Sequence, residues 1–370
     1  MKILVLAQTP PPVHGQSLMV RTLLGGLPRP GIEVRHVQVA LSRDHGDIGR
    51  WRPAKAFAAV RAGLAARRIG RSGAFDALYY VPAPGKRGAL WRDLVILGLA
   101  RPAFPRLVLH WHAPGLGEWL ETRATGPERN AARRILGRAD LSIILADSLR
   151  HDAEALGARR IAVVPNGVPD PAPPARGPAP AGRPLRVLFL GQCSEEKGLF
   201  AAAEAVISLN RAGGVAPKAP GFTLVAAGPF PRRSDAERFA ALSGRHPGWL
   251  RHAGEVSGEA KRALFLECDC LCLPTRYPHE GQPLVVLEAL AYDLPVVATR
   301  WRAIADTLPP DAGMLVEPGD GSALAAAIAA VRSNPPGSGA SRAAYLRDFT
   351  EERHLNRLAG ELSRLASSNP

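Results

Sequence analysis

The chain has 370 residues, 46% of them hydrophobic, and its 47 Lys and Arg against 33 Asp and Glu leave a net charge of +14. This length exceeds what one core normally supports, so we expect about two globular domains. No apolar run approaches the roughly 20 residues of a membrane span, so we expect no transmembrane helix among these residues.

Lys2–Ala7 is too short for the core of a signal peptide, and we interpret it as a first buried strand of a cytoplasmic protein. From there apolar, strand-like runs alternate with helix-length segments. The predicted strands are 2–7, 33–40, 76–81, 106–111, 140–145 and 160–164, and the predicted helices are 17–27, 53–70, 88–101, 127–137 and 148–156. This alternation indicates βαβ units and a parallel sheet.

The positive charge lies mainly in the first half, because residues 1–170 hold 25 Lys and Arg against 13 acids, and residues 171–370 hold 22 against 20. Residues 50–73 contain seven basic residues and no acid, interleaved with Trp51, Phe57, Val60 and Leu64. One interpretation is an amphipathic helix that rests on an anionic membrane surface. The other is an ordinary surface helix whose apolar side chains face the core.

A proline-rich stretch within residues 169–184 predicts an interdomain linker. Leu185–Leu190 then restarts the alternation and echoes Lys2–Ala7, so we expect two similar halves with a ligand cleft between them. The predicted organisation is a first domain over 1–168, the linker, a second domain over 185–345 and a C-terminal helix over 346–370, whose leucines recur at helical spacing.

The four cysteines do not suggest a disulfide framework. Cys268, Cys270 and Cys272 alternate along a strand-like segment, and Cys193 stands apart. Structural zinc sites usually pair their ligands at a different spacing, so reduced core thiols are the favoured interpretation over a metal site.

Two carboxylates eight positions apart, Glu280 and Glu288, form the most informative motif. Glu288 lies inside an apolar helical run, and an ionised carboxylate is rarely buried without a partner, so we expect something polar to meet it. Gly281 permits a close backbone approach, and Pro283 suits a first helical turn. The amides at this helix start would suit a phosphate or a sugar hydroxyl. They belong to Gln282, Leu284 and Val285.

The segment Leu273–Thr299 resembles the donor-site motif of retaining glycosyltransferases of the GT-B fold, family four, in which two glutamates at this spacing hold a nucleotide-sugar. Further similarities to that family occur in the correct order through both halves, at Gly15, His112 and Lys197. The resemblance implies an α/β protein with two Rossmann-like, doubly wound parallel-sheet domains facing a cleft. It also implies a C-terminal helix that packs back on the first domain.

Lys197 is expected in the first turn of a helix capped by Ser194, where a cation opposes the helix dipole. The resemblance implies that it binds the donor diphosphate, and the alternative is a surface lysine. Gln192 stands where the family usually has an arginine, which removes one charge from the leaving-group site. Gly15 and Gln16 are implied to face the diphosphate, and the alternative there is a plain turn.

His112 ends a predicted strand, and the resemblance implies a catalytic place for it near the reacting sugar. His110 lies on the same strand face, so one of the two would be a packed core histidine. Val256 is implied to touch the nucleotide base. Glu280 is implied to bind hydroxyls of the transferred sugar, and Glu288 those of the ribose.

The function implied is metal-independent, retaining transfer from a nucleoside diphosphate sugar, without any cofactor, to a glycan or lipid-linked acceptor in cell-surface polysaccharide or glycolipid synthesis. A peripheral position on the inner membrane face would fit the basic first half. A nucleotide-sugar epimerase of the same fold and a non-catalytic, basic membrane-binding or nucleic-acid-binding protein are the alternatives. Only 6% of the residues are aromatic and no recognition motif occurs, so we expect no nucleic acid partner.

Overall fold

The computed structural model describes residues 1–39, 53–73, 75–174, 182–214, 220–333 and 339–367. The contacts within the chain divide it into two compact units. Unit 1 consists of Met1–Gly167, Pro278–Gln282 and Glu351–Pro370, and unit 2 consists of Val168–Tyr277 and Pro283–Thr350. Residues 50–52 of the basic stretch and 175–181 of the predicted linker lie outside the described residues.

Unit 1 is built on a parallel sheet with the strand order β2-β1-β3-β4-β5-β6 in the described residues. Its strands are β1 (Lys2–Ala7), β2 (Glu33–Gln38), β3 (Ala77–Tyr80), β4 (Leu107–Trp111), β5 (Leu141–Ile144) and β6 (Ile161–Val163). Its helices are α1 (Gly15–Gly26), α2 (Pro53–Ser72), α3 (Arg87–Ala100), α4 (Leu116–Thr122), α5 (Gly126–Ile135), α6 (His151–Ala155) and α14 (Glu351–Ser367).

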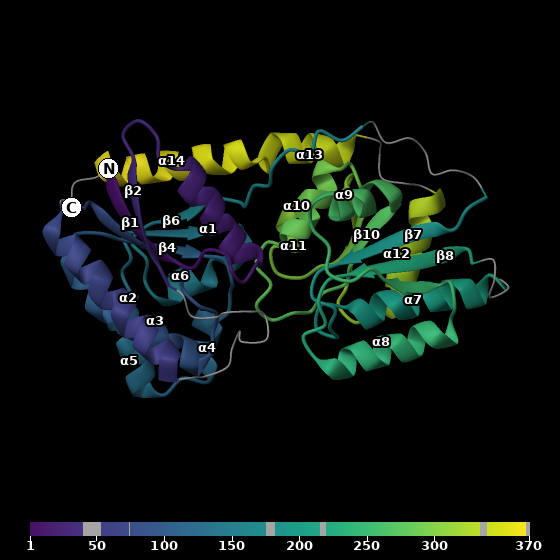
Figure 1. Ribbon diagram of the computed structural model, residues 1–370, viewed down its shortest axis with the longest axis horizontal. Coiled ribbons are helices and arrows are strands. Elements are labelled where there is room, and N and C mark those ends of the chain that lie inside the picture. The colour runs from purple at the N-terminus through teal and green to yellow at the C-terminus, as the bar shows by residue number, and fades with distance from the viewer. Residues whose placement is uncertain (40–52, 74, 175–181, 215–219, 334–338, 368–370) are drawn as a thin grey trace. The chain divides into compact units, whose positions relative to one another are not determined.

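Strand β1, which lies between β2 and β3, shows why helices cover both faces of this sheet. Its side chains are buried on both sides, as a parallel sheet requires. Ile3 and Val5 pack in the core under α1 and α14, whereas Leu4 and Leu6 pack in the core under α2, α3 and α5. The two helical layers are visible on either side of the sheet in Figure 1.

The C-terminal helix α14 is a structural part of unit 1. Leu358, Leu362 and Leu365 are buried in the same core as Ile3. The fit against α1 is close, because a Cβ added at Gly26 would lie 2.2 Å from Leu355 Cδ1.

Unit 2 has a parallel sheet with the strand order β12-β11-β10-β7-β8-β9 among its described residues. Its strands are β7 (Leu185–Leu190), β8 (Phe222–Ala227), β9 (Leu250–His252), β10 (Cys270–Leu273), β11 (Val296–Thr299) and β12 (Gly313–Val316). Its helices are α7 (Leu199–Ala212), α8 (Arg233–Arg245), α9 (Gly258–Glu267), α10 (Leu284–Ala291), α11 (Ile304–Thr307), α12 (Gly321–Ser333) and α13 (Ala340–Asp348).

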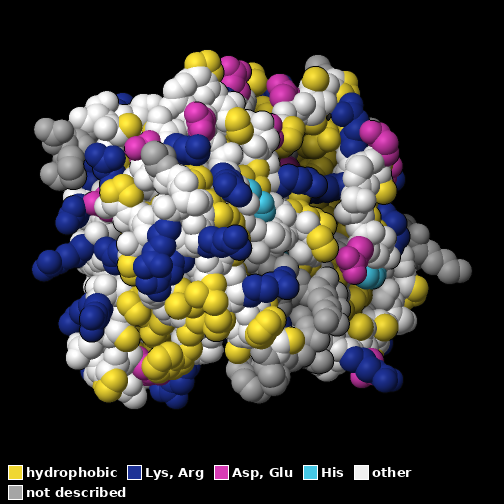
Figure 2. Space-filling view, turned by 60° about the vertical axis from the view of Figure 1, so that its left-hand side comes forward, with side chains coloured by type: hydrophobic (Ala, Val, Ile, Leu, Met, Phe, Trp, Pro, Cys, Tyr) yellow, Lys and Arg dark blue, Asp and Glu magenta, His cyan; other side chains and the backbone are white. Residues whose placement is uncertain are grey.

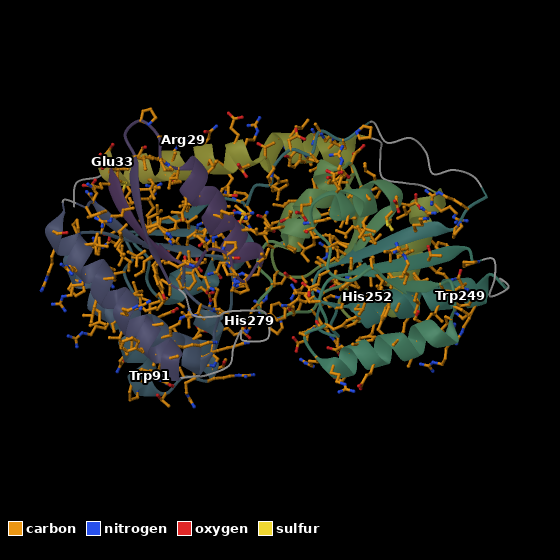
Figure 3. The ribbon with its side chains drawn as sticks, in the orientation of Figure 1. Arg29, Glu33, Trp91, Trp249, His252 and His279 are labelled. Carbon is orange, nitrogen blue, oxygen red and sulfur yellow. The ribbon has the colours of Figure 1, made fainter. Side chains whose placement is uncertain are left out.

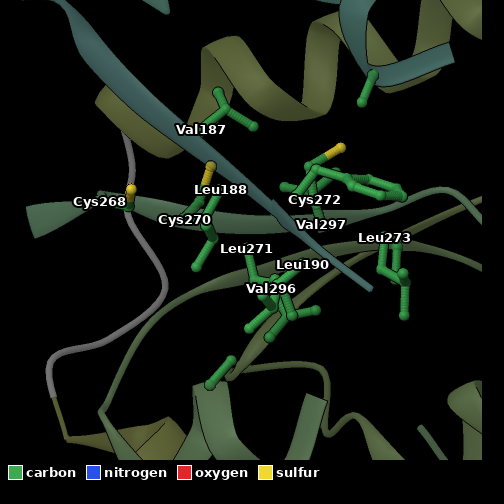
Figure 4. Packing of buried hydrophobic residues seen from close by; sticks show 14 of the residues in the cluster. Val187, Leu188, Leu190, Cys268, Cys270, Leu271, Cys272, Leu273, Val296 and Val297 are labelled. Carbon is green, nitrogen blue, oxygen red and sulfur yellow. The ribbon is translucent and has the colours of Figure 1, made fainter. Parts of the chain in front are cut away.

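All four cysteines are free and buried in the core of unit 2. Cys270 and Cys272 lie on β10 among Leu188, Leu271 and Val297 (Figure 4). Burial raises the pKa of the Cys272 thiol to about 12, so this side chain acts as a small apolar group.

The predicted fold class, α/β with two Rossmann-like parallel-sheet domains, is confirmed. In unit 1, α4 was not predicted from the sequence, because its seven residues give too short an apolar pattern. The interpretation that Phe57, Val60 and Leu64 face the core is wrong, because all three are exposed. In the described ranges, no helix combines the length and hydropathy that a bilayer crossing needs.

Candidate active site

In unit 1, the loop after β1 leads into α1, and Gly15 and Gln16 are the first two residues of that helix. His14 caps it, because its Nδ1 accepts from the Ser17 amide at 3.3 Å while Ser17 Oγ accepts from the His14 amide at 3.0 Å. The helix therefore begins two residues earlier than expected. The amides of Gly15 and Gln16 belong to the first turn, where backbone N–H groups have no intrahelical acceptor.

The two histidines at the end of β4 have different environments. His110 is 1% exposed, and its Nδ1 lies 2.5 Å from the hydroxyl of Tyr79 in the core. His112 follows the last residue of β4 and is 9% exposed. The packed core histidine is therefore His110, and His112 is the one placed beyond the carboxyl end of the strand.

A third histidine joins this pair, from a part of the chain that local sequence patterns could not connect with it. His354 on α14 stacks on His110 with ring centroids 6.3 Å apart, and its Nδ1 lies 2.7 Å from the Pro165 carbonyl oxygen. The rings of His110 and His112 are 4.1 Å apart. Burial lowers the pKa of His112 to about 3, with repulsion from His354 and His14 adding to the effect. A neutral imidazole can donate one hydrogen bond through one ring nitrogen and accept one through the other.

The segment Pro278–Gln282 belongs to unit 1 and lies directly against the end of β4. A Cβ added at Gly281 would sit 2.1 Å from the carbonyl oxygen of His112, so only glycine fits there. The Asn166 amide donates to Gln282 Oε1 at 2.7 Å, and Asn166 Nδ2 donates to the Gln282 carbonyl oxygen at 3.3 Å. These contacts place Glu280, which is 6% exposed, next to the backbone that carries His112.

His279 completes the attachment of this loop. Its Nδ1 lies 3.0 Å from the carbonyl oxygen of Pro114, two residues beyond His112 (Figure 3). Sequence reasoning did not single out His279 or Asn166 as supports of Glu280, because neither contact follows from a local spacing.

In unit 2, the loop after β7 carries Lys197, and here the predicted local structure is wrong. Helix α7 begins at Leu199, and Gly198 precedes it with a positive φ of 88°. Lys197 therefore lies in the turn before the helix, so the argument from the helix dipole does not apply to it. Ser194 caps this turn, because its Oγ accepts from the Lys197 amide at 3.3 Å.

Contacts with the segment after β10 fix the position of Lys197. Its Nζ lies 4.8 Å from the centre of the Tyr277 ring, a cation–π contact. The Arg276 amide donates to the Glu196 carbonyl oxygen at 2.8 Å. Gln192 is exposed at the start of the same loop, and its carbonyl oxygen accepts from the Ser194 amide.

Helix α10 begins at Leu284, with Pro283 as its N-cap rather than in its first turn. Leu284 and Val285 are half-buried at this start, where the helix presents amides without intrahelical acceptors. Glu288 lies four residues after the first residue of this helix, about one turn from its N-terminal amides.

Glu288 has the polar partner that its burial led us to expect, and this partner lies within the protein. Lys261 Nζ on α9 lies 2.5 Å from Glu288 Oε1, and the Glu288 side chain is 24% exposed. Burial raises the pKa of Glu288, and the ammonium of Lys261 opposes that rise. Val256 lies just before α9 and packs half-buried on the core, so one short stretch carries both Val256 and Lys261.

A cavity of about 480 Å³ opens in unit 2 beside α7 and α12. Its lining includes Glu195, Gly198 and Arg276, but none of the predicted donor-binding residues. The described part of unit 2 thus presents Lys197, Val256 and Glu288 outside this cavity.

Comparisons with known proteins indicate a family for the second half of the chain. Residues 184–334 match the family described as glycosyl transferases group 1. The amylovoran biosynthesis glycosyltransferase AmsK of Erwinia amylovora is 28% identical over 193 residues, which cover 50% of this chain and 46% of AmsK. The match thus spans about half the length of AmsK, and it spans 48% of the length of two other curated relatives.

Two solved structures share the fold over nearly the whole chain. Sucrose-phosphate synthase from Thermosynechococcus elongatus has a TM-score of 0.74 at 19% identity, with 100% of both chains covered. HepE from Anabaena, in complex with UDP, has a TM-score of 0.70 at 18% identity, with 98% of this chain and 100% of HepE covered. Residues 184–334 therefore resemble the glycosyl transferases group 1 family, and the solved structures share the fold of the whole chain.

Proposed function

We propose that this protein is a retaining glycosyltransferase that moves a sugar from a nucleoside diphosphate donor to an acceptor hydroxyl. The observation that carries the proposal is the position of three residues within the family match. Lys197 follows β7, and Glu280 and Glu288 follow β10, so all three lie beyond carboxyl ends of parallel strands. In open α/β sheets, ligands bind outside those ends.

Each part of the donor would be bound by different residues. The ammonium of Lys197 would neutralise the diphosphate, and the first amides of α10 would add hydrogen bonds to it. Glu288, held by Lys261, would accept hydrogen bonds from the ribose hydroxyls. Val256 would pack on the base. HepE has been crystallised with UDP and with UDP-glucose, which supports a donor of this chemical class.

Unit 1 would act on the transferred sugar. Glu280 would bind its hydroxyls, and the neutral ring of His112 would hydrogen-bond beside the anomeric carbon. As the bond from that carbon to the diphosphate breaks, Lys197 would stabilise the negative charge that develops on the leaving group. Gly15 and Gln16 would approach the diphosphate through their amides. We propose that the transfer requires no metal ion and no further cofactor.

We propose an acceptor that is a glycan or a lipid-linked precursor, in cell-surface polysaccharide or glycolipid synthesis, handled at the inner face of the cytoplasmic membrane. The name of AmsK, which belongs to amylovoran biosynthesis, supports a polysaccharide context. The excess of basic residues in the first half fits an anionic or lipid-linked acceptor.

The test is a thermal-shift screen of UDP-, GDP- and ADP-sugars, because a ligand that binds only the folded state raises its apparent stability. One nucleotide class should raise the Tm, and Lys197→Ala should reduce that shift and lower turnover by roughly 10²–10³-fold, as loss of one oxyanion donor does. Arg233→Ala, at a 92% exposed side chain on α8, is the matched control. The proposal fails if no nucleotide shifts the Tm, or if Lys197→Ala lowers turnover by less than about threefold.

A further inference from the structure

Helix α2 of unit 1 packs on its neighbours with its smallest side chains. Ala59, Ala62 and Ala66 are buried in the core at helical spacing. The contact with α3 is so close that a Cβ at Gly63 would lie 3.0 Å from the Ile96 carbonyl oxygen. The core face of α2 therefore consists of alanine and glycine.

The large apolar side chains of α2 point the other way. Phe57 is 69% exposed, Leu64 is 50% exposed and Val60 is 39% exposed. Arg61 and Arg68 are exposed too, and positions 57, 61, 64 and 68 share one face of the helix. A surface helix of a globular protein normally places its bulky apolar residues inward, so α2 is reversed.

Helix α3 extends this surface. Trp91 is 50% exposed and Val95 is 37% exposed on its outer side. The indole N–H of Trp91 donates to Glu128 at 3.3 Å, and Arg87 pairs with the same carboxylate at 2.9 Å. Figure 2, which brings this side of the molecule forward, shows hydrophobic and basic side chains interspersed on it. We call Phe57, Val60, Leu64, Trp91 and Val95, with Arg61 and Arg68 between them, the α2–α3 surface.

The charge of this surface identifies the kind of partner. Helix α2 contains no acidic residue, and Arg61, Arg68 and Arg71 form no ion pair with the described residues. A partner must therefore be anionic, and it must also accept large apolar side chains. A nucleic acid backbone satisfies the first condition only, whereas the headgroup region of an anionic bilayer satisfies both. A tryptophan with an apolar ring and a bonded N–H is typical of that interface.

We propose that the α2–α3 surface docks on an anionic lipid bilayer, with Phe57, Leu64 and Trp91 entering the headgroup region and the arginines contacting lipid phosphates. This inference deepens the proposed function, because it would hold the enzyme where lipid-linked acceptors lie. It does not depend on that function, since lipid binding is measured without donor or acceptor.

The test is co-sedimentation of the full chain with two kinds of vesicle. One kind is phosphatidylcholine alone, and the other contains about 30 mol% phosphatidylglycerol, whose anionic headgroups attract basic segments. Binding should require the anionic lipid and weaken with salt. Arg61→Glu with Arg68→Glu should reduce binding by about fivefold or more per arginine. Phe57→Ser with Leu64→Ser should also reduce it, at unchanged far-UV circular dichroism.

Matched controls come from unit 2. Leu346→Ser replaces a side chain that is 43% exposed on α13, and Arg233→Glu with Arg245→Glu reverses two charges on α8. Neither should change vesicle binding. Equal binding to neutral and anionic vesicles, or equal loss in the controls, would overturn the proposal. Two further results would overturn it: a dimer in solution that Phe57→Ser dissociates, or tighter binding to duplex DNA than to the anionic vesicles.

Discussion

At the scale of single residues, the arrangement depends on how closely the backbone of Pro278–Gln282 approaches β4. Gly281 leaves no room for a Cβ beside the carbonyl oxygen of His112, and Glu280 precedes it in the chain. The position of a carboxylate that would bind the transferred sugar is thus set by one glycine.

We therefore predict that Gly281→Ala displaces Glu280. The added Cβ would meet the His112 oxygen at 2.1 Å, so the loop must shift, at a cost of about 1–3 kcal/mol in stability. Because small misplacements of catalytic groups are costly, kcat/KM should fall by about 10²-fold. Gly126→Ala, where nothing lies within 4 Å, is the control. Equal activities of the two variants would show that the contact does not position Glu280.

The pair of Lys261 and Glu288 leads to a second prediction. Glu288→Gln removes the charge but keeps an acceptor, so the fold should survive. The Kd for the nucleoside diphosphate of whichever donor class raises the Tm should rise by roughly tenfold, the value of one hydrogen bond to a charged group. Isothermal titration calorimetry measures it, with Glu237→Gln on the exposed face of α8 as the control. An unchanged Kd would remove the ribose role from Glu288.

The buried histidines predict a dependence of stability on pH. Burial lowers the pKa of His110, His112 and His354, so all three are neutral in the folded protein at neutral pH. In the unfolded chain they take up protons below about pH 6.5, so their contribution to stability is present above that pH. This contribution to stability is lost as the pH falls from about 6.5 toward the pKa values of the folded protein, and the pKa of folded His112 is about 3.

Urea unfolding at pH 7.5, 6.5 and 5.5 measures this effect. The free energy of unfolding of unit 1 should fall by about 1 kcal/mol per histidine for each pH unit below 6.5. His354→Gln should make the fall shallower, while His151→Gln, at a 53% exposed side chain, should leave it unchanged. A wild-type stability that is flat between pH 6.5 and 5.5 would show that the three rings are not kept neutral.

These residues also show where prediction from the sequence ends. Glu280, Gly281 and Glu288 were recognised because their spacing within one segment is informative. Lys261, His354 and Asn166 were not, because their partners come from other elements and no periodicity connects them. A polar partner for Glu288 was expected, but its identity as Lys261 could not be predicted for the same reason.

At the scale of elements, α2 shows that an apolar pattern gives a helix without giving its orientation. The same residues fit a core-facing helix or a membrane-facing one, and the choice depends on the Ala and Gly face that packs on α3. For α7, the turn Ser194–Gly198 delays the helix, because Gly198 adopts a left-handed conformation next to the Pro274 carbonyl oxygen.

The reversed packing of α2 predicts opposite effects on its two faces. Ala66→Leu adds bulk to a fully buried position and should lower stability by about 1–3 kcal/mol. Leu64→Ser on the exposed face should change it by no more than about 0.5 kcal/mol. Urea denaturation compares the two. A larger loss for Leu64→Ser would mean that this face is covered within the folded chain.

At the scale of the whole molecule, the alternation of strand and helix was sufficient to predict two Rossmann-like domains. The order of motifs along the chain was sufficient to predict the family that residues 184–334 match. The assignment of Pro278–Gln282 to unit 1 could not be predicted, because that segment is continuous in sequence with unit 2. Long-range contacts, rather than local pattern, decide such assignments.

The most direct test of the proposed function is release of nucleoside diphosphate from the sugar nucleotide that stabilises the protein, compared between wild type and Glu280→Gln. We predict release by the wild-type protein, increased by acceptor, and a loss of about 10²-fold or more in the variant at unchanged Tm. Equal release by the two proteins, or none from any donor that binds, would contradict a glycosyltransferase with Glu280 in its site.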